Sequence, residues 1–275
     1  MTFGQRLQAA FDSGGHLCVG IDPHAYLLTE WGLSDDAAGV REFGLRVIEA
    51  ASTRCAIVKP QVAFFERHGS AGFAALEAVL GAARDAGLLV IADAKRGDIG
   101  STFEAYADAW LRPGSGLEAD ALTVSPYLGV GAVSGVRAIA EAHGKGLFLL
   151  SATSNPEAVS LQMSRSADGR TVAASIVKEV EAWNSREDGL GSTGLVLGAT
   201  VNLADFGIDG LANTPILAPG FGHQGARYAD LRSIYGVAVE HVVVSASRSI
   251  LAAGPSGLAA AIEREAAEVA EALAA

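Results

Sequence analysis

LLVIADAKRGDIGST, residues 88–102, is the stretch that decides the fold. Its first six residues, 88–93, are mostly apolar and have the length of a buried strand. Charged side chains follow at once, in Asp93, Lys95 and Asp98, and a helical pattern begins at residue 99. A strand, a charged turn and a helix in this order form the repeating unit of a parallel α/β protein.

The same unit recurs along the chain. The spacing of apolar residues predicts helices over 35–52, 70–86, 99–111, 130–143, 171–187, 227–235 and 256–273, with the weakest helical pattern at 200–214. Nearly continuous apolar runs, typical of parallel strands covered by helices, predict strands at 17–21, 55–59, 88–93, 120–124, 146–151, 194–199, 215–218 and 241–245.

Eight strands in 275 residues predict one α/β domain over residues 1–275, a (β/α)₈ TIM barrel, since such barrels span about 250 residues. An open, doubly wound sheet is the alternative. No GxGxxG follows the first strand, which disfavours a dinucleotide-binding version of that sheet.

Composition excludes several classes of protein. The formal net charge is −11 and no basic run occurs, so we expect neither nucleic acid nor an anionic membrane as partner. A small anionic substrate remains compatible, because a few cations in a cleft outweigh distant surface charge. The chain shows no signal peptide and no uninterrupted apolar run of membrane-spanning length, and we expect a cytoplasmic protein. Cys18 and Cys55 are expected to be reduced, and the histidine spacing predicts no metal site.

Charged residues end each of the first three predicted strands. These residues are Asp22, Lys59, Asp93 and Lys95. Catalytic groups of (β/α)₈ barrels lie at the carboxyl ends of the strands, so these side chains are predicted to converge there. A solvated turn would explain one charged strand end, but three successive ones indicate a site. Alternating opposite charges also make their burial tolerable.

Two glycine- or serine-rich loops predict a phosphate site. PGFGHQG (219–225) follows the seventh strand and SASRSI (245–250) follows the eighth, and these two loops often bind phosphate in such barrels. Gln224 and Arg248 are the candidate ligands. Ordinary turns and a surface arginine remain the alternative for either loop alone. The polar segment 153–170 is predicted to be a lid that orders when ligand binds, and equal protease sensitivity with and without a nucleotide analogue would contradict this.

DAKRGDIGST (93–102) resembles the signature DxKxxDxxxT of orotidine 5′-phosphate decarboxylases, in the form of the longer bacterial type 2 branch. Further blocks are similar to that branch and extend the resemblance over essentially the whole chain: VKPQVAFFE (58–66), SPYLG (125–129), ATSNPE (152–157) and PGFGHQGA (219–226). DxKxxD alone is shared with related sugar-phosphate barrels, so these blocks carry the specific assignment.

The resemblance implies decarboxylation of orotidine 5′-monophosphate to UMP in de novo pyrimidine biosynthesis, without a cofactor. It implies a catalytic array of Lys59, Asp93, Lys95 and Asp98, with Lys95 donating the proton to the C6 carbanion. It implies ribose contacts from Asp22 and Thr102, a pyrimidine contact from Ser154, and phosphate contacts from Gln224 and Arg248. It also implies a homodimer with shared active sites, in which Asp98 and Thr102 reach the partner's site. His223 departs from the small or aliphatic residue expected in the phosphate loop.

Two other functions remain open at this point. A related DxKxxD barrel, such as a hexulose-phosphate synthase or keto-gulonate-phosphate decarboxylase, would require magnesium and act on open sugar phosphates. A non-catalytic barrel that binds pyrimidine nucleotides would release no CO₂. Retention of every charged position disfavours the second, because binding alone needs no buried row of lysines and aspartates.

Overall fold

The computed structural model describes residues 1–222 and 225–275, and eight parallel strands form a closed barrel at its centre. Each strand pairs with the next in chain order, and β8 pairs with β1. The strands are β1 (Leu17–Ile21), β2 (Ile57–Pro60), β3 (Leu89–Arg96), β4 (Ala121–Val124), β5 (Gly146–Ala152), β6 (Thr193–Leu197), β7 (Ile216–Pro219) and β8 (Val242–Ala246). The predicted (β/α)₈ barrel is confirmed, and the open sheet is wrong.

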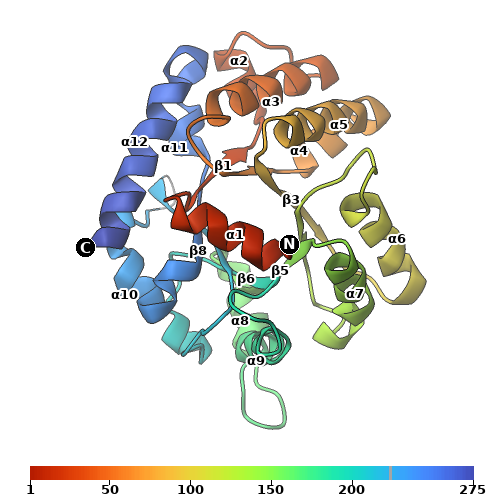
Figure 1. Ribbon diagram of the computed structural model, residues 1–275, viewed down its shortest axis with the longest axis vertical. Coiled ribbons are helices and arrows are strands. Elements are labelled where there is room, and N and C mark those ends of the chain that lie inside the picture. Colours follow the sequence, from red (N-terminus) through yellow and green to blue (C-terminus); the bar gives the residue numbers. More distant parts are fainter. Residues whose placement is uncertain (223–224) are drawn as a thin grey trace.

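Helices surround the barrel (Figure 1). The longer ones between the strands are α3 (Ala37–Ala51), α5 (Gly69–Asp85), α6 (Gly100–Leu111), α7 (Ser134–Ala142) and α9 (Val172–Asn184), and α12 (Gly254–Ala274) follows the last strand. Shorter elements are α2 (Ala25–Glu30), α4 (Ala63–Glu66), α8 (Val159–Gln162), α10 (Leu231–Tyr235), α11 (Arg248–Leu251) and the 3₁₀ turns η1 (Val130–Val133), η2 (Pro156–Ala158), η3 (Leu203–Phe206), η5 (Tyr228–Asp230) and η6 (Gly236–His241). The connection 200–214, where the helical pattern was weakest, holds η3 as its helical element.

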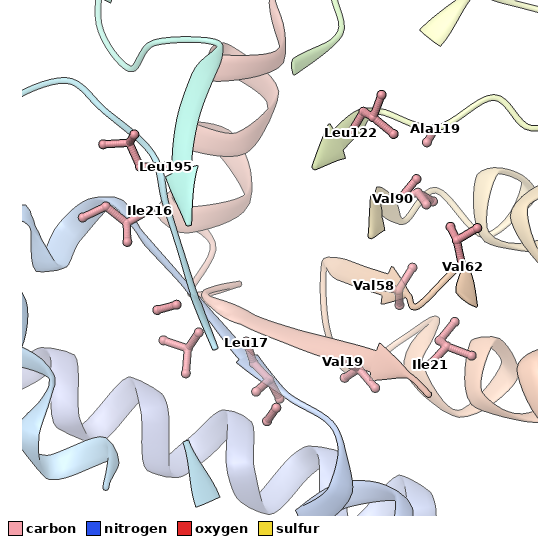
Figure 2. Close-up of a cluster of buried hydrophobic side chains, with 14 of the residues drawn as sticks. Leu17, Val19, Ile21, Val58, Val62, Val90, Ala119, Leu122, Leu195 and Ile216 are labelled. Carbon is pink, nitrogen blue, oxygen red and sulfur yellow. The ribbon is translucent and has the colours of Figure 1, made fainter. Parts of the chain in front are cut away.

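The strands are buried on both faces, which explains their continuous hydrophobicity. In β1, Leu17, Val19 and Ile21 point outward and pack with the helix-facing side chains of the other strands (Figure 2). Cys18 of the same strand belongs instead to a second apolar cluster, with Phe148 of β5. Side chains of a strand alternate between its two faces, so this second cluster fills the barrel.

An N-terminal helix, α1 (Phe3–Asp12), lies across one end of the barrel (Figure 1). Its Phe3 meets Phe148 edge-on, with ring centroids 6.0 Å apart, and so joins the cluster that fills the barrel. A Cβ atom on Gly146 would lie 2.2 Å from the Phe3 ring, so glycine is required at the start of β5. With this end covered, the opposite end of the barrel is the one available to a ligand.

Strand β3 is longer than predicted and ends irregularly. It continues through Lys95 to Arg96, and its pairing with β4 shifts register between Ala92 and Arg96. Lys95 has φ 49°, the only positive φ outside glycine among the described residues. A non-glycine residue in this region is strained by about 1 kcal/mol or more, which is common where a side chain is positioned for function.

No helix within residues 1–222 and 225–275 is both long and apolar enough to span a membrane.

Candidate active site

A cavity of about 370 Å³ opens at the carboxyl ends of the strands. The ends of β1, β2, β3, β7 and β8 and the turns that follow them supply its walls. The lining residues are Asp22, His24, Lys59, Gln61, Ala63, Phe64, Asp93, Pro219, Gly220, Phe221, Ser245, Ser247 and Arg248. Four of the sequence-predicted residues therefore share one cavity: Asp22, Lys59, Asp93 and Arg248.

Asp93 lies between two lysines. Its Oδ2 is 3.0 Å from Lys59 Nζ, and its Oδ1 is 2.6 Å from Lys95 Nζ. The side chains of Lys59 and Asp93 are 8% and 10% exposed, whereas that of Lys95 is 45% exposed. Lys95 Nζ also lies 3.5 Å from Gln61 Oε1. The row thus holds one ammonium deep in the site and presents the other at its edge.

Mutual attraction keeps this row charged. Burial raises the pKa of the Asp93 carboxyl, but the ammoniums of Lys59 and Lys95 outweigh burial and hold that pKa well below its usual range. Burial lowers the pKa of Lys59, and the carboxylates of Asp93 and Asp22 outweigh it, so the pKa of Lys59 lies above its ordinary value. At neutral pH the site presents fixed charges to a ligand.

Thr123 of β4 positions this row from the side. Its hydroxyl donates to Asp93 Oδ1 at 2.9 Å and accepts the backbone N–H of Lys95 at 2.9 Å. Thr123 is itself 1% exposed. One buried hydroxyl therefore supports both the carboxylate orientation and the strained Lys95 backbone.

Asp22 extends the row to β1. Its Oδ2 accepts the Ser247 hydroxyl at 2.6 Å, and its Oδ1 is buried without a hydrogen-bond partner among the described residues. A buried carboxylate oxygen without a partner is costly. In this cavity Oδ1 is available to accept a hydroxyl from a ligand.

The phosphate-site candidates are divided between described and undescribed residues. Arg248 begins α11 after β8 and lines the cavity beside Gly220 and Phe221, which follow β7. His223 and Gln224 lie outside the described residues. The structure therefore brings Arg248 and the first part of the 219–225 loop to one cavity, and their binding of phosphate stays a prediction.

Four described residues among those predicted do not line this cavity. Lys95 lies beside it, bound to the lining residue Asp93. Asp98 follows β3, where its Oδ1 accepts the backbone N–H of Ile99 at 2.8 Å, and Thr102 is exposed on α6. Ser154 follows β5 and packs close to Gly198. The described part of the chain contains no group of three histidine, cysteine, aspartate or glutamate side chains arranged to hold a metal ion.

The same chain is similar to known proteins over nearly its full length. A sequence profile described as the orotidine 5′-phosphate decarboxylase/HUMPS family matches residues 15–263. The chain belongs to this family. An orotidine 5′-phosphate decarboxylase of Salinispora tropica is 51% identical over 258 residues, covering 94% of this chain and 92% of the relative. The resemblance drawn from DAKRGDIGST and its flanking blocks is confirmed.

Solved structures agree with this family assignment. A Streptomyces avermitilis protein assigned as orotidine 5′-phosphate decarboxylase is 51% identical and superposes with a TM-score of 0.95, covering 100% of this chain and 96% of its own. OMP decarboxylase of Leishmania donovani is 30% identical with a TM-score of 0.81, and each chain is covered completely.

Within this decarboxylase-family site, His24, Gln61 and Thr123 were not predicted from the sequence, and the SASRSI loop was predicted without Ser247 being singled out. Thr123 and Ser247 act through hydrogen bonds between strands that are distant in sequence, and spacing carries no signal for these. His24 and Gln61 carried a weak signal, because each follows a predicted charged strand end by two residues. Burial lowers the pKa of His24, so its imidazole is biased toward the neutral form.

Proposed function

We propose that this protein decarboxylates orotidine 5′-monophosphate to UMP, and that residues 1–275 act as one barrel domain. Family membership and the curated relatives support the reaction. The Lys59–Asp93–Lys95 row is the observation that carries the proposal. It places fixed opposite charges at one end of a cavity that also holds Arg248, as a phosphorylated substrate that develops negative charge requires.

Lys95 is proposed as the proton donor. The bond between C6 of the pyrimidine and its carboxyl carbon breaks, CO₂ leaves, and the electron pair remains on C6. The Lys95 ammonium stabilises this carbanion and then transfers a proton to it, which leaves a neutral amine. Asp93 holds Lys95 Nζ at 2.6 Å from its Oδ1 and so positions it before the reaction. Lys59, on the other carboxylate oxygen, prevents Asp93 from taking up a proton itself.

Binding roles follow from position in the cavity. Asp22, with its unpartnered Oδ1, is proposed to accept a ribose hydroxyl. Arg248 is proposed to bind the phosphate together with Gln224, because a guanidinium forms paired hydrogen bonds with phosphate oxygens. Ser154 is proposed to contact the pyrimidine. No metal or other cofactor has a role in this mechanism.

We further propose a homodimer in which Asp98 and Thr102 complete the partner's site. The surface around them is apolar. Ile99 is 61% exposed, and the neighbouring turn presents Tyr127 at 76% and Leu128 at 56% exposure. The two turns are adjacent, since the backbone N–H of Ser125 donates to Arg96 O at 2.9 Å. Adjacent exposed apolar side chains of this size are typical of a contact surface.

The experiment is to follow the loss of orotidine 5′-monophosphate absorbance with EDTA present. We expect loss with the wild type and none with Lys95→Ala. Lys178→Ala, on the exposed face of α9, is the matched control and should retain the wild-type rate. A rate abolished by EDTA would contradict the metal-free mechanism, and turnover of an open sugar phosphate with magnesium, but not of orotidine 5′-monophosphate, would favour a related metal-dependent enzyme. A folded protein that binds UMP without turnover would contradict the decarboxylase and indicate a nucleotide-binding barrel.

A further inference from the structure

A buried carboxylate outside the cavity joins the two phosphate-site loops. Glu265 lies on α12 and is 4% exposed. Its Oε2 accepts the Tyr228 hydroxyl at 2.5 Å and the Ser249 hydroxyl at 3.1 Å. Tyr228 ends the stretch that follows β7, and Ser249 is the residue after Arg248. One oxygen atom of α12 therefore holds both loops, and the chemistry proposed above does not use it.

Tyr228 connects this carboxylate to the cavity wall. Its ring stacks on Phe221 with a centroid distance of 5.4 Å, and Phe221 lines the cavity. Ala226, two residues before Tyr228, is tied to the cavity wall, since its N–H donates to Gly220 O at 3.2 Å and its carbonyl accepts the N–H of Gly222 at 3.0 Å. A displacement of Tyr228 would therefore be transmitted to Gly220 and Phe221.

Ser249 makes the second connection. Gly222 has φ +67°, and a Cβ atom there would lie 3.0 Å from Ser249 Oγ. The β7 loop thus packs directly on the turn that carries Arg248. This close contact requires the β7 loop and the Arg248 turn to keep their positions. Glu265, which accepts a hydrogen bond from each of them, fixes both.

We propose that Glu265 is a positioning residue for phosphate binding, which holds the β7 loop, through Tyr228, and the Arg248 turn, through Ser249, at the separation that a phosphate group requires. This inference rests on the proposed function, because it assumes that Arg248 and the β7 loop bind the phosphate of a nucleotide. A carboxylate suits the task better than an amide, because a charged acceptor forms shorter and stronger hydrogen bonds with two hydroxyl groups.

The chemistry of Tyr228 agrees with this arrangement. Burial and then the hydrogen bond to Glu265 raise the pKa of Tyr228 far above its ordinary value, so the hydroxyl remains a donor at all working pH values. The phenol is half-buried between Phe221 and α12, and loss of its hydroxyl alone leaves the ring packing in place.

The test compares Tyr228→Phe and Glu265→Gln with Tyr235→Phe. Tyr235 is the matched control, because it is a buried tyrosine of α10 whose hydroxyl donates to Leu197 O of β6 at 2.9 Å, and not to Glu265. For each variant we would measure the dissociation constants of UMP and uridine, the KM and kcat for orotidine 5′-monophosphate, and the thermal unfolding midpoint. UMP and uridine differ only in the phosphate, so their ratio isolates the phosphate contribution.

We expect Tyr228→Phe and Glu265→Gln to weaken UMP binding and raise KM roughly fivefold or more, with uridine binding and kcat unchanged. Tyr235→Phe should lower the unfolding midpoint while the UMP-to-uridine ratio stays at the wild-type value. If Tyr228→Phe leaves the ratio of the UMP and uridine dissociation constants unchanged, whether both ligands bind more weakly or neither does, the positioning role is overturned. Wild-type decarboxylation is measured first, before any variant is compared. If the wild type shows none, the proposed function is contradicted, and not the positioning role.

Discussion

At the scale of single residues, the charged row depends on an uncharged group, the hydroxyl of Thr123. Thr123→Val keeps the shape of the side chain and removes its hydrogen bonds to Asp93 Oδ1 and from the Lys95 backbone, with the longer one to Ala92 O. We expect kcat to fall about tenfold or more, because Lys95 loses part of what holds its strained backbone and Asp93 loses a donor. Thr123→Ser should restore most of the rate.

The control for Thr123 is Thr193→Val, which changes another buried strand threonine at the start of β6. It should leave kcat unchanged. The absorbance assay measures kcat for both variants. An equal loss in both would show that kcat falls because any such change disturbs the packing of the barrel, and not because Thr123 positions Lys95 and Asp93.

The charge state of Asp93 makes a prediction for acid stability. Because the pKa of Asp93 is lowered in the folded protein, its contribution to stability is present above its unfolded pKa of about 3.9 and is lost as the pH falls below that value. Asp93→Asn should therefore lose stability less steeply than the wild type on acidification, by up to about 1.4 kcal/mol per pH unit. At neutral pH it should be less stable by about 3–5 kcal/mol, since Lys59 is left buried without its partner.

Urea unfolding at several pH values between about 3 and 7 measures both effects of Asp93→Asn, the loss of stability at neutral pH and the shallower loss on acidification. Asp205→Asn, an exposed change on η3, should follow the wild-type curve at every pH. Parallel curves for Asp93→Asn and the wild type below pH ~4 would show that Asp93 has no depressed pKa.

Residue types at strand ends predicted much of this site but not its hydrogen bonds. Asp22, Lys59 and Asp93 end apolar runs, and the topology of a parallel barrel places the ends of such runs together. The partners Thr123 and Ser247 depend on strand register, which a single sequence does not specify. The separation of Asp98 from the cavity depends on the turn after Lys95, whose positive φ also has no sequence signal.

At the scale of elements, strands and surrounding helices were predictable, while short connecting helices were not. The strands are continuous apolar runs, and their predicted limits differ from the observed ones by one or two residues, except at the end of β3. Elements such as α2, α4 and α11 have one or two turns, too few for a periodic pattern to show. Helix α1 was missed although Phe3, Leu7 and Phe11 have helical spacing and Thr2 and Gln5 form a capping box at its start.

Helix α1 closes the end of the barrel opposite to the site. A substitution there should therefore change the free energy of unfolding without changing kcat. Phe3→Ala should lower the free energy of unfolding by about 3–5 kcal/mol, because it removes a ring packed on Phe148 and leaves a cavity. The kcat of the folded protein should not change, since the cavity lies at the other end. Val237→Ala, at a position 85% exposed, should change neither quantity. Urea unfolding and the absorbance assay at low temperature distinguish these outcomes, and a lower kcat for Phe3→Ala would contradict the separation.

At the scale of the whole molecule, the proposed dimer makes each active site depend on two chains. Lys95 and Asp98 are only three residues apart, yet the structure pairs Lys95 with Asp93, whereas Asp98 accepts the backbone N–H of Ile99. If Asp98 acts in the partner's site, Lys95→Ala and Asp98→Ala each inactivate both sites of a homodimer. In a mixed dimer, one site then carries both substitutions and the other carries neither.

Subunit exchange between the two inactive variants should therefore restore activity. Random mixing makes half of the dimers mixed, each with one intact site of two, so we expect about a quarter of the wild-type rate. The control is a mixture of Lys95→Ala with Asp93→Asn. Both residues act in the site of their own chain, so every site in a mixed dimer keeps one substitution and activity should not recover. Denaturant-assisted exchange followed by the absorbance assay gives the measurement, with sedimentation to establish the dimer. A dimer that exchanges subunits without recovery would show that Asp98 serves its own chain, and the turn after β3 would then have to move toward the cavity when substrate binds.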